Sequence, residues 1–345
     1  LVCLLVSMLQ LPVVRSAIYA CPVLLLVLWL LDGGRMPSTA QLVITAPFIW
    51  LLVLFVFYIP MTGLFAWKWS FFICVYTAIF LFVDFSKTDV NLLYLNMVFM
   101  ILLAYSWFTG NVLSVDIQTL EKGLTDSHVV TESPLAFPLG LFACFWMLKG
   151  RYWLGLINFI VTLFAFKRIV LVAMAAFAVT LLIPKKVRSS GVYALCGVFV
   201  VTMVISLGIE FAYGRFDELL TTTTGRSANA LSMGRQDLWR EVLGRVQFDY
   251  TDFALVGVGM DKVIEGHMAK AVWTPFHNDL LAIWLSYGAI GVIIFTGLVL
   301  IPRDPEARAL ATFILTIFLT DNTLIYQHVM IPYLFMLSTI IQDRR

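Results

Sequence analysis

The stretch YWLGLINFIVTLFAFKRIVLVAMAAFAVTLLIP, residues 152–184, is apolar except for Lys167 and Arg168 near its middle. It is too long for one helical crossing of a bilayer, because a crossing takes about 20 apolar residues at about 1.5 Å each. The stretch therefore predicts two helices that turn at the basic pair.

Apolar stretches long enough for about one helical crossing each also make up most of the rest of the chain. The chain is 61% hydrophobic and only 13% charged over 345 residues, and soluble domains carry about twice that charged fraction. The predicted fold class is an all-α polytopic membrane protein with about 12 transmembrane helices. The predicted spans lie near residues 1–14, 17–31, 41–59, 64–83, 89–108, 135–148, 152–167, 169–184, 191–210, 277–301, 307–325 and 328–342.

Basic residues indicate which side each short connection faces, because cytoplasmic loops are enriched in Lys and Arg. A first span that starts in the cytoplasm makes both termini cytoplasmic. The chain is then divided into spans 1–9 (residues 1–210), one large loop with amphipathic helices on the outer side (211–276) and spans 10–12 (277–345). The basic residues on the cytoplasmic side are Arg35, Lys87, Lys149, Arg151, Lys185, Lys186, Arg188, Arg303 and Arg308.

Some basic residues fall on the outer side. A long loop crosses the membrane regardless of its charge, so we favour solvation for most of its arginines: Arg215, Arg226, Arg240 and Arg245. For Lys167 and Arg168 we favour a function, since ionisable groups at membrane depth are costly and usually mark sites. Lys167 could extend outward along its alkyl chain, which makes Arg168 the stronger candidate of the two.

Arg235 opens a segment with helical periodicity, residues 234–246. It falls within the apolar stripe of that helix and in its first turn, where backbone N–H groups favour an anion. This position predicts a phosphate clamp, and the alternative is a structural salt bridge to Glu210, Asp217 or Asp321. The predicted stripe contains Leu238, Trp239, Val242 and Val246, and the residues predicted to face away are Gln236, Asp237, Arg240, Glu241 and Arg245.

His277 is expected in the first turn of the tenth span, with Thr274 as the N-cap and Pro275 at the first helical position. The positive end of a helix disfavours imidazolium, so the neutral ring could accept a proton. The alternative is a histidine bonded to Asn278 or to a backbone carbonyl. Neither metal-ligand spacings nor a DxD motif nor a P-loop occurs in the sequence, so we expect no metal, no cofactor and no nucleic acid.

The order of these features resembles the O-antigen polymerase/ligase family of bacterial envelope glycosyltransferases. The resemblance covers roughly residues 150–345. It rests on Arg168 between two spans, GRQDLW at 234–239, the turn at 257–259, and Pro275-Phe276-His277-Asn278 entering a helix. It implies a 12-span protein of the bacterial inner membrane whose active site faces the periplasm.

The resemblance also implies roles for the matching positions. Arg168 and Arg235 would bind the pyrophosphate of an undecaprenyl-pyrophosphate-linked oligosaccharide, and His277 would act as general base on the acceptor hydroxyl or orient it. Further candidates for the pyrophosphate are Lys167, Arg226 and Arg240, and Asn278 and Asp321 would support the site. Besides the lipid-linked glycan and the bilayer, a chain-length regulator is a candidate partner.

Two branches of that family and two other classes remain open at this point. The stretch PFHNDLL (275–281) favours a polymerase, which extends another lipid-linked repeat unit, over a ligase, which transfers the glycan to lipid A-core. A transporter or flippase of lipid-linked oligosaccharide would show pseudo-symmetric halves, whereas here the polar residues gather on one side. A non-catalytic scaffold is the remaining alternative.

Overall fold

The computed structural model describes residues 21–31, 33–34, 36–58, 64–83, 91–109, 133–165, 167–232, 234–265 and 276–342. Within these ranges every regular element is a helix. Among the described residues, three helices are long and apolar enough to cross a membrane, namely α4 (Thr39–Phe57), α12 (Gly191–Ala212) and α17 (Asp279–Val299). Other apolar helices pack around them: α3 (Cys21–Leu31), α5 (Leu64–Phe82), α6 (Leu92–Thr109), α8 (Ala136–Leu148), α9 (Tyr152–Leu163), α10 (Arg168–Leu182), α18 (Pro305–Phe318) and α19 (Gln327–Gln342).

Each predicted apolar stretch from 41–59 onward coincides with one of these helices. The long stretch 152–184 breaks where expected, since α9 ends at Leu163 and α10 begins at Arg168. The predicted span 307–325 is too long, because α18 ends at Phe318 and Asp321 lies in the connection beyond it. The predicted span 1–14 lies outside the described residues, and the number of crossings stays a prediction.

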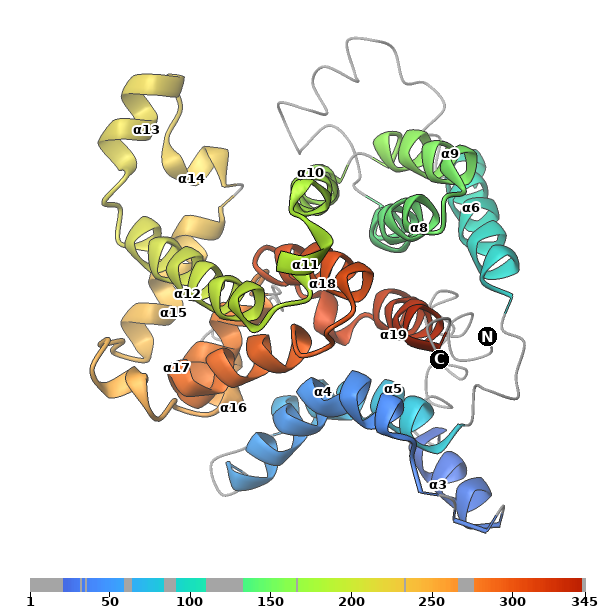
Figure 1. Cartoon of the computed structure of the whole chain (residues 1–345). Coiled ribbons are helices and arrows are strands. Elements are labelled where there is room, and N and C mark those ends of the chain that lie inside the picture. The colour runs from blue at the N-terminus through green and yellow to red at the C-terminus, as the bar shows by residue number, and fades with distance from the viewer. Residues whose placement is uncertain are drawn as a thin grey trace.

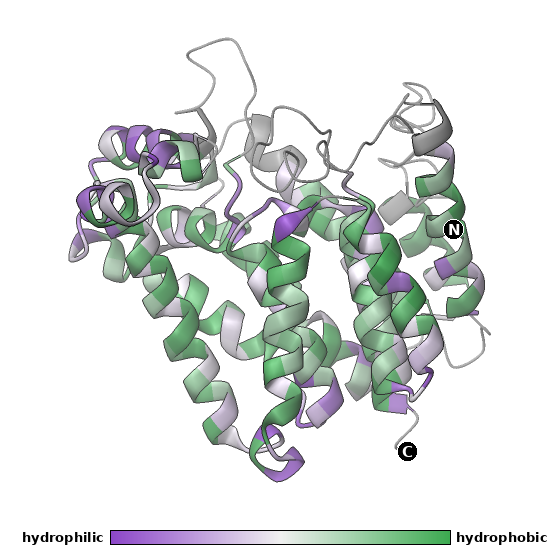
Figure 2. Cartoon of the chain, turned by 90° about the horizontal axis from the view of Figure 1, so that it is seen from above, coloured by the Kyte–Doolittle hydropathy of each residue, from purple (hydrophilic) through white to green (hydrophobic). Residues whose placement is uncertain are grey.

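The helices form one bundle whose middle is apolar. α18 and α19 lie between α6, α8 and α9 on one side and α12 and α17 on the other (Figure 1). Hydrophilic residues gather at the two ends of the bundle, and hydrophobic residues fill the length between them (Figure 2). This distribution is the one expected of helices in a bilayer, where polar residues collect at the interfaces.

Helix α17 is the most buried of the long helices, and it is broken near its middle. Gly288 has φ 81° and ψ 170°, which is not helical. The backbone N–H groups of Val258 and Gly259 donate to the carbonyls of Leu285 and Ser286 at 2.9 and 3.0 Å. A loop thus supplies the hydrogen bonds that the broken helix lacks, as irregular backbone at membrane depth requires. A Cβ atom at Gly257 would lie 2.2 Å from the backbone of Ser286, so only glycine fits there.

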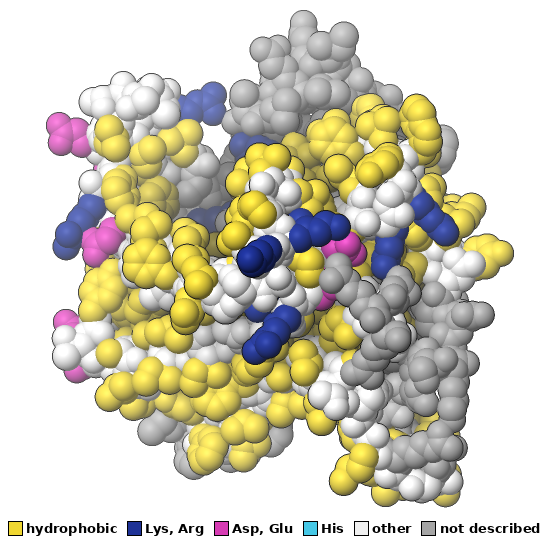
Figure 3. Space-filling model, viewed as in Figure 1, with side chains coloured by type: hydrophobic (Ala, Val, Ile, Leu, Met, Phe, Trp, Pro, Cys, Tyr) yellow, Lys and Arg dark blue, Asp and Glu magenta, His cyan; other side chains and the backbone are white. Residues whose placement is uncertain are grey.

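The end of the bundle near α11 (Lys185–Arg188) is basic. Figure 3 shows Lys and Arg side chains gathered over α11. Two arginines of this end are nevertheless buried. Arg188 donates to the carbonyl of Pro305 at 3.0 Å, and Arg308 donates to those of Leu300 and Pro302 at 2.9 and 2.7 Å. Arg308 thus closes the C-terminal end of α17, and Arg188 ties α11 to the start of α18.

The polar segment that follows α12 folds into short helices, which we call the cap segment (residues 213–265). Its elements are α13 (Asp217–Thr224), α14 (Ala228–Leu231), α15 (Arg235–Arg245), η5 (Asp252–Ala254) and α16 (Met260–Glu265). They surround one end of α12 and α17 (Figure 1). The described part of the predicted loop therefore contains helices, with α15 where the periodicity predicted one.

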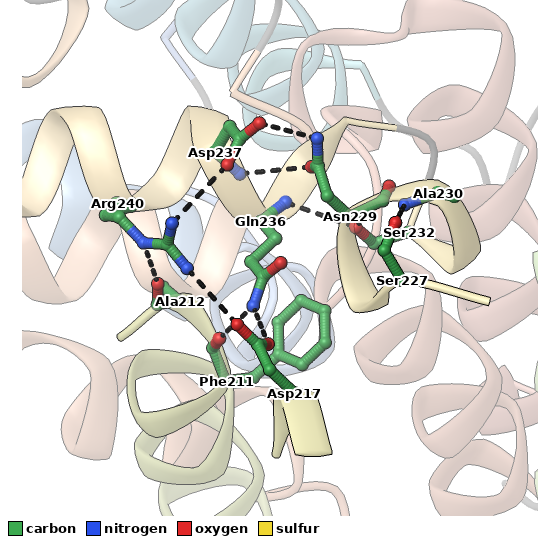
Figure 4. Close-up of polar contacts among 10 residues, drawn as sticks. All are labelled: Phe211, Ala212, Asp217, Ser227, Asn229, Ala230, Ser232, Gln236, Asp237 and Arg240. Carbon is green, nitrogen blue, oxygen red and sulfur yellow. Dashed lines mark hydrogen bonds and ion pairs between the residues drawn. The ribbon is translucent and has the colours of Figure 1, made fainter. Parts of the chain in front are cut away.

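The cap segment is fixed to the end of α12 by side-chain hydrogen bonds (Figure 4). Gln236 donates to the carbonyl of Phe211 at 2.9 Å and to Asp217 at 2.5 Å, and Arg240 donates to the carbonyl of Ala212 at 2.8 Å. The prediction that Gln236 faces away was wrong, since its side chain is buried. Free carbonyls at the end of α12 attract its amide, and hydrophobic periodicity does not register such a partner.

Candidate functional site

A buried carboxylate lies at the centre of the candidate site. Asp321 follows α18 and precedes η7 (Thr323–Ile325), and its side chain is 2% exposed. Its Oδ2 lies 3.0 Å from Nζ of Lys167, and its Oδ1 lies 3.3 Å from Nδ1 of His277. The backbone N–H of Asn322 also donates to Oδ1, at 2.8 Å. One carboxylate therefore joins the start of α10 to the start of α17.

These contacts keep Asp321 ionised. Burial alone would raise the pKa of Asp321, but the hydrogen bond with His277 and the positive charge of Lys167 outweigh it and lower that pKa below its usual range. The carboxylate in turn holds Lys167 inward, where the ammonium also lies 5.3 Å from the ring centre of Phe137. The side chain of Lys167 is 13% exposed. It therefore does not extend outward along its alkyl chain, which was the alternative considered from the sequence.

His277 lies just before α17 and not in its first turn. The side chain of Asn278 accepts a hydrogen bond from the N–H of Leu281 at 2.8 Å, so Asn278 is the N-cap and the helix begins at Asp279. The prediction of a cap at Thr274 was wrong in register, because Asn278 is a strong N-cap residue nearer the helix. Thr274 and Pro275 lie outside the described residues.

The backbone of His277 has an unusual conformation. Its φ is +54°, a left-handed conformation that non-glycine residues rarely adopt and that often marks a functional position. Its side chain is 28% exposed, with Nδ1 directed at Asp321. Because an ionised carboxylate only accepts hydrogen bonds, Nδ1 carries the proton in the neutral ring. Nε2 is then the nitrogen with a lone pair for a ligand.

Helix α15, which begins at Arg235, contacts the segment that carries His277 through Trp239. The indole Nε1 of Trp239 donates to the carbonyl of Phe276, the residue before His277, at 3.0 Å. Arg235 precedes Trp239 by one helical turn, and residues four apart lie on the same face of a helix. Arg235 therefore lies one helical turn from the point where α15 contacts the segment that carries His277.

The alternative of a structural salt bridge to Arg235 is not observed. The three acids considered have other partners: Glu210 pairs with Arg215 at 2.6 Å, Asp217 with Arg240 at 3.8 Å, and Asp321 with Lys167. Within the described ranges, the half-buried side chain of Arg235 forms neither a hydrogen bond nor an ion pair. A half-buried guanidinium of this kind is suited to an anionic ligand.

The remaining predicted basic residues lie in different settings. Arg168 is the first residue of α10 and is half-buried beside Lys167. Arg226 is exposed in the connection between α13 and α14. Arg240 is exposed but tied to Ala212, Asp217 and Asp237, so its guanidinium holds the cap segment together (Figure 4).

Two further residues at the site were missed from the sequence. Asp279 is buried and its Oδ2 accepts from the N–H of Leu324 at 2.8 Å, which ties η7 to the start of α17. Burial, and next the charge of Asp321, raise the pKa of Tyr326, whose ring stacks on His328 at 5.3 Å. An acid within the predicted span 277–301 was the signal that could have identified Asp279. For Tyr326 the sequence offers no such signal.

The structure thus brings together Lys167, His277, Asn278 and Asp321, and α15 contacts the residue before His277 through Trp239. In the described part of the chain, no three or more His, Cys, Asp or Glu residues form a group that could hold a metal ion. Comparisons with models of protein families, with curated proteins and with solved structures gave no match.

Proposed function

We propose that this chain is a membrane glycosyltransferase of the O-antigen polymerase type. It transfers a glycan from undecaprenyl pyrophosphate to a hydroxyl of another lipid-linked repeat unit at the periplasmic face of the bacterial inner membrane. The observation that carries the proposal is Asp321 between Lys167 and His277, at the end of a bundle of apolar helices. The proposed topology has about twelve crossings, with both termini in the cytoplasm.

The chemistry is a displacement at the anomeric carbon of the donor. The acceptor oxygen forms a bond to that carbon, and the bond from the carbon to the pyrophosphate oxygen breaks. Nε2 of His277 takes the proton of the acceptor hydroxyl, while Asp321 holds the ring in the required tautomer. General base catalysis of this kind contributes about 10²–10⁴-fold.

The leaving group is undecaprenyl pyrophosphate, whose negative charge grows as the bond breaks. In this proposal Arg235 and Arg168 stabilise that charge, because fixed cationic donors act most strongly in a site that excludes water. The N-termini of α10 and α15 add their partial positive charge. We assign Lys167 a positioning role through Asp321, which its contact supports better than a contact with pyrophosphate.

The test is an assay of the purified chain in proteoliposomes. Lipid-linked repeat units alone should yield longer glycans and free undecaprenyl pyrophosphate. If glycan transfer requires added lipid A-core, the chain is a ligase and the polymerase assignment is wrong. If authentic substrates give neither product, but lipid-linked oligosaccharide moves between leaflets, the chain is a transporter.

A further inference from the structure

An apolar groove leads away from the candidate site along the helices. It is a cavity of about 770 Å³ between α10, α12 and α18. Trp239 and Asn278 line one end, beside the start of α15 and His277. Tyr193 and Leu300 line the other end, near the buried arginines. The groove therefore runs from the site through the apolar part of the bundle.

The threonine hydroxyls that line the groove, in the part of the chain that the structure describes, are bonded to carbonyls of their own helices. Thr180 donates to the carbonyl of Ala176 at 2.9 Å, and Thr316 donates to that of Thr312 at 2.8 Å. Their hydroxyl hydrogens are thus bonded within their own helices. Polar groups on a ligand would therefore add little to its binding in the groove, whereas a hydrocarbon chain would bind well there.

The groove is open sideways, toward the surrounding lipid. Val172 and Val179 on α10 are 55% and 61% exposed, and Val200 on α12 is 48% exposed. All three line the groove. A lipid chain can therefore enter from the bilayer without passing through the protein.

The end of the groove away from the site is closed. The hydroxyl groups of Tyr193 and Thr312 lie 2.7 Å apart, across α12 and α18. Behind them, the guanidinium of Arg308 lies 5.9 Å from the ring centre of Tyr193 and donates to the carbonyl of Arg188 at 2.6 Å. A hydrocarbon chain that enters from the site ends at this layer. The groove is therefore a binding site for a lipid chain and does not form a route across the membrane.

We propose that this groove holds the polyprenyl chain of the donor lipid while its pyrophosphate lies at the site. The inference rests on the proposed function and names the part of the donor that the helices bind. The end of the groove nearest the site determines where the pyrophosphate of the lipid lies. Asn278 lines that end and adjoins His277, and Trp239 lines it one turn from Arg235. A pyrophosphate at the basic groups and a hydrocarbon chain in the groove are the two halves of one molecule.

The test compares two tryptophan substitutions on α12. Val200→Trp fills the groove, whereas Leu195→Trp changes a 72% exposed residue that does not line it. Each variant is given the same glycan on undecaprenyl pyrophosphate and on the short geranyl pyrophosphate. Val200→Trp should raise KM for the undecaprenyl donor about tenfold, the loss expected when about two buried methylenes are excluded. Its KM for the geranyl donor, and both KM values of Leu195→Trp, should stay at the wild-type level. Equal KM values for the two variants would overturn the inference.

A binding experiment separates this inference from the proposed function. Cys196 is exposed and lines the groove, so an apolar maleimide should label it in a variant whose other cysteines are serine. Undecaprenyl pyrophosphate should slow that labelling at least threefold, and phosphatidylglycerol at the same mole fraction should not. Protection without turnover would support the groove and refute the transferase. Turnover without protection, or equal protection by phosphatidylglycerol, would refute the groove alone.

Discussion

The ammonium nitrogen of Lys167 lies 3.0 Å from Oδ2 of Asp321, and both side chains are largely buried. This ion pair joins the start of α10 to the turn after α18, and the second oxygen of the carboxylate orients His277. The positive charge of Lys167 lowers the pKa of Asp321 and keeps it ionised, and the ionised carboxylate holds the imidazole of His277 in place.

Asp321→Asn should lower turnover by about 10²–10⁴-fold, because Nδ1 of His277 loses the carboxylate that fixes its tautomer. It should also destabilise the protein by about 3–5 kcal/mol, since the largely buried Lys167 loses the carboxylate with which it forms an ion pair. Adding Lys167→Met should restore most of the stability without restoring turnover. Thermal unfolding in detergent and release of undecaprenyl pyrophosphate measure the two effects separately. Full turnover in either variant would contradict the role given to Asp321.

Acid should remove the contribution of Asp321 to stability. The pKa of this carboxyl is lowered in the folded protein, so its contribution is complete above the unfolded pKa of about 3.9. The contribution is lost as pH falls through the lower folded pKa. The difference in Tm between wild type and Asp321→Asn should therefore be constant above pH about 5 and shrink below pH about 4. A difference that grows on acidification would be inconsistent with an ionised, paired Asp321.

Arg235→Ala should reduce activity and Arg240→Ala should reduce stability, although both residues lie on α15. Arg235→Ala should reduce kcat/KM by about 10²–10³-fold and leave Tm unchanged, because the guanidinium is expected to act on the leaving pyrophosphate. Arg240→Ala should lower stability by about 1–2 kcal/mol through loss of its bond to Ala212, with turnover of the folded protein preserved. Similar losses of turnover in both variants would show that Arg235 has no special role.

Gly257→Ala should destabilise the protein strongly. The new Cβ would lie 2.2–2.4 Å from the backbone of Ser286 and Tyr287, so the loop could no longer bond to the break in α17. We expect a loss of about 3 kcal/mol or more. Gly244→Ala is the control, since a Cβ there meets no atom within 4 Å, and it should be neutral or stabilising. Equal Tm values for the two variants would contradict the close packing of residue 257.

The sequence predicted the helices well, because an apolar stretch of sufficient length has few alternatives to a helix in a bilayer. The break between α9 and α10 was predicted for the same reason, since one crossing could not hold the whole stretch. The helix that begins at Arg235 was predicted from the hydrophobic periodicity of residues 234–246.

Features that depend on distant partners could not be predicted in this way. Lys167 turns inward because Asp321 lies beside it, although 154 positions separate the two in sequence. Gln236 is buried because the carbonyl of Phe211 is free to accept its amide. The start of α17 was misplaced because two good cap residues, Thr274 and Asn278, stand close together, and only the fold selects Asn278.

The most direct measurement of the central claim is single-turnover release of undecaprenyl pyrophosphate by His277→Ala. The control is Arg215→Ala, which removes an exposed side chain paired only with Glu210 among the described residues. We predict that His277→Ala releases product at least about 10²-fold more slowly than wild type while binding the donor normally, and that Arg215→Ala matches wild type. Release at the wild-type rate by a folded His277→Ala protein would contradict the account.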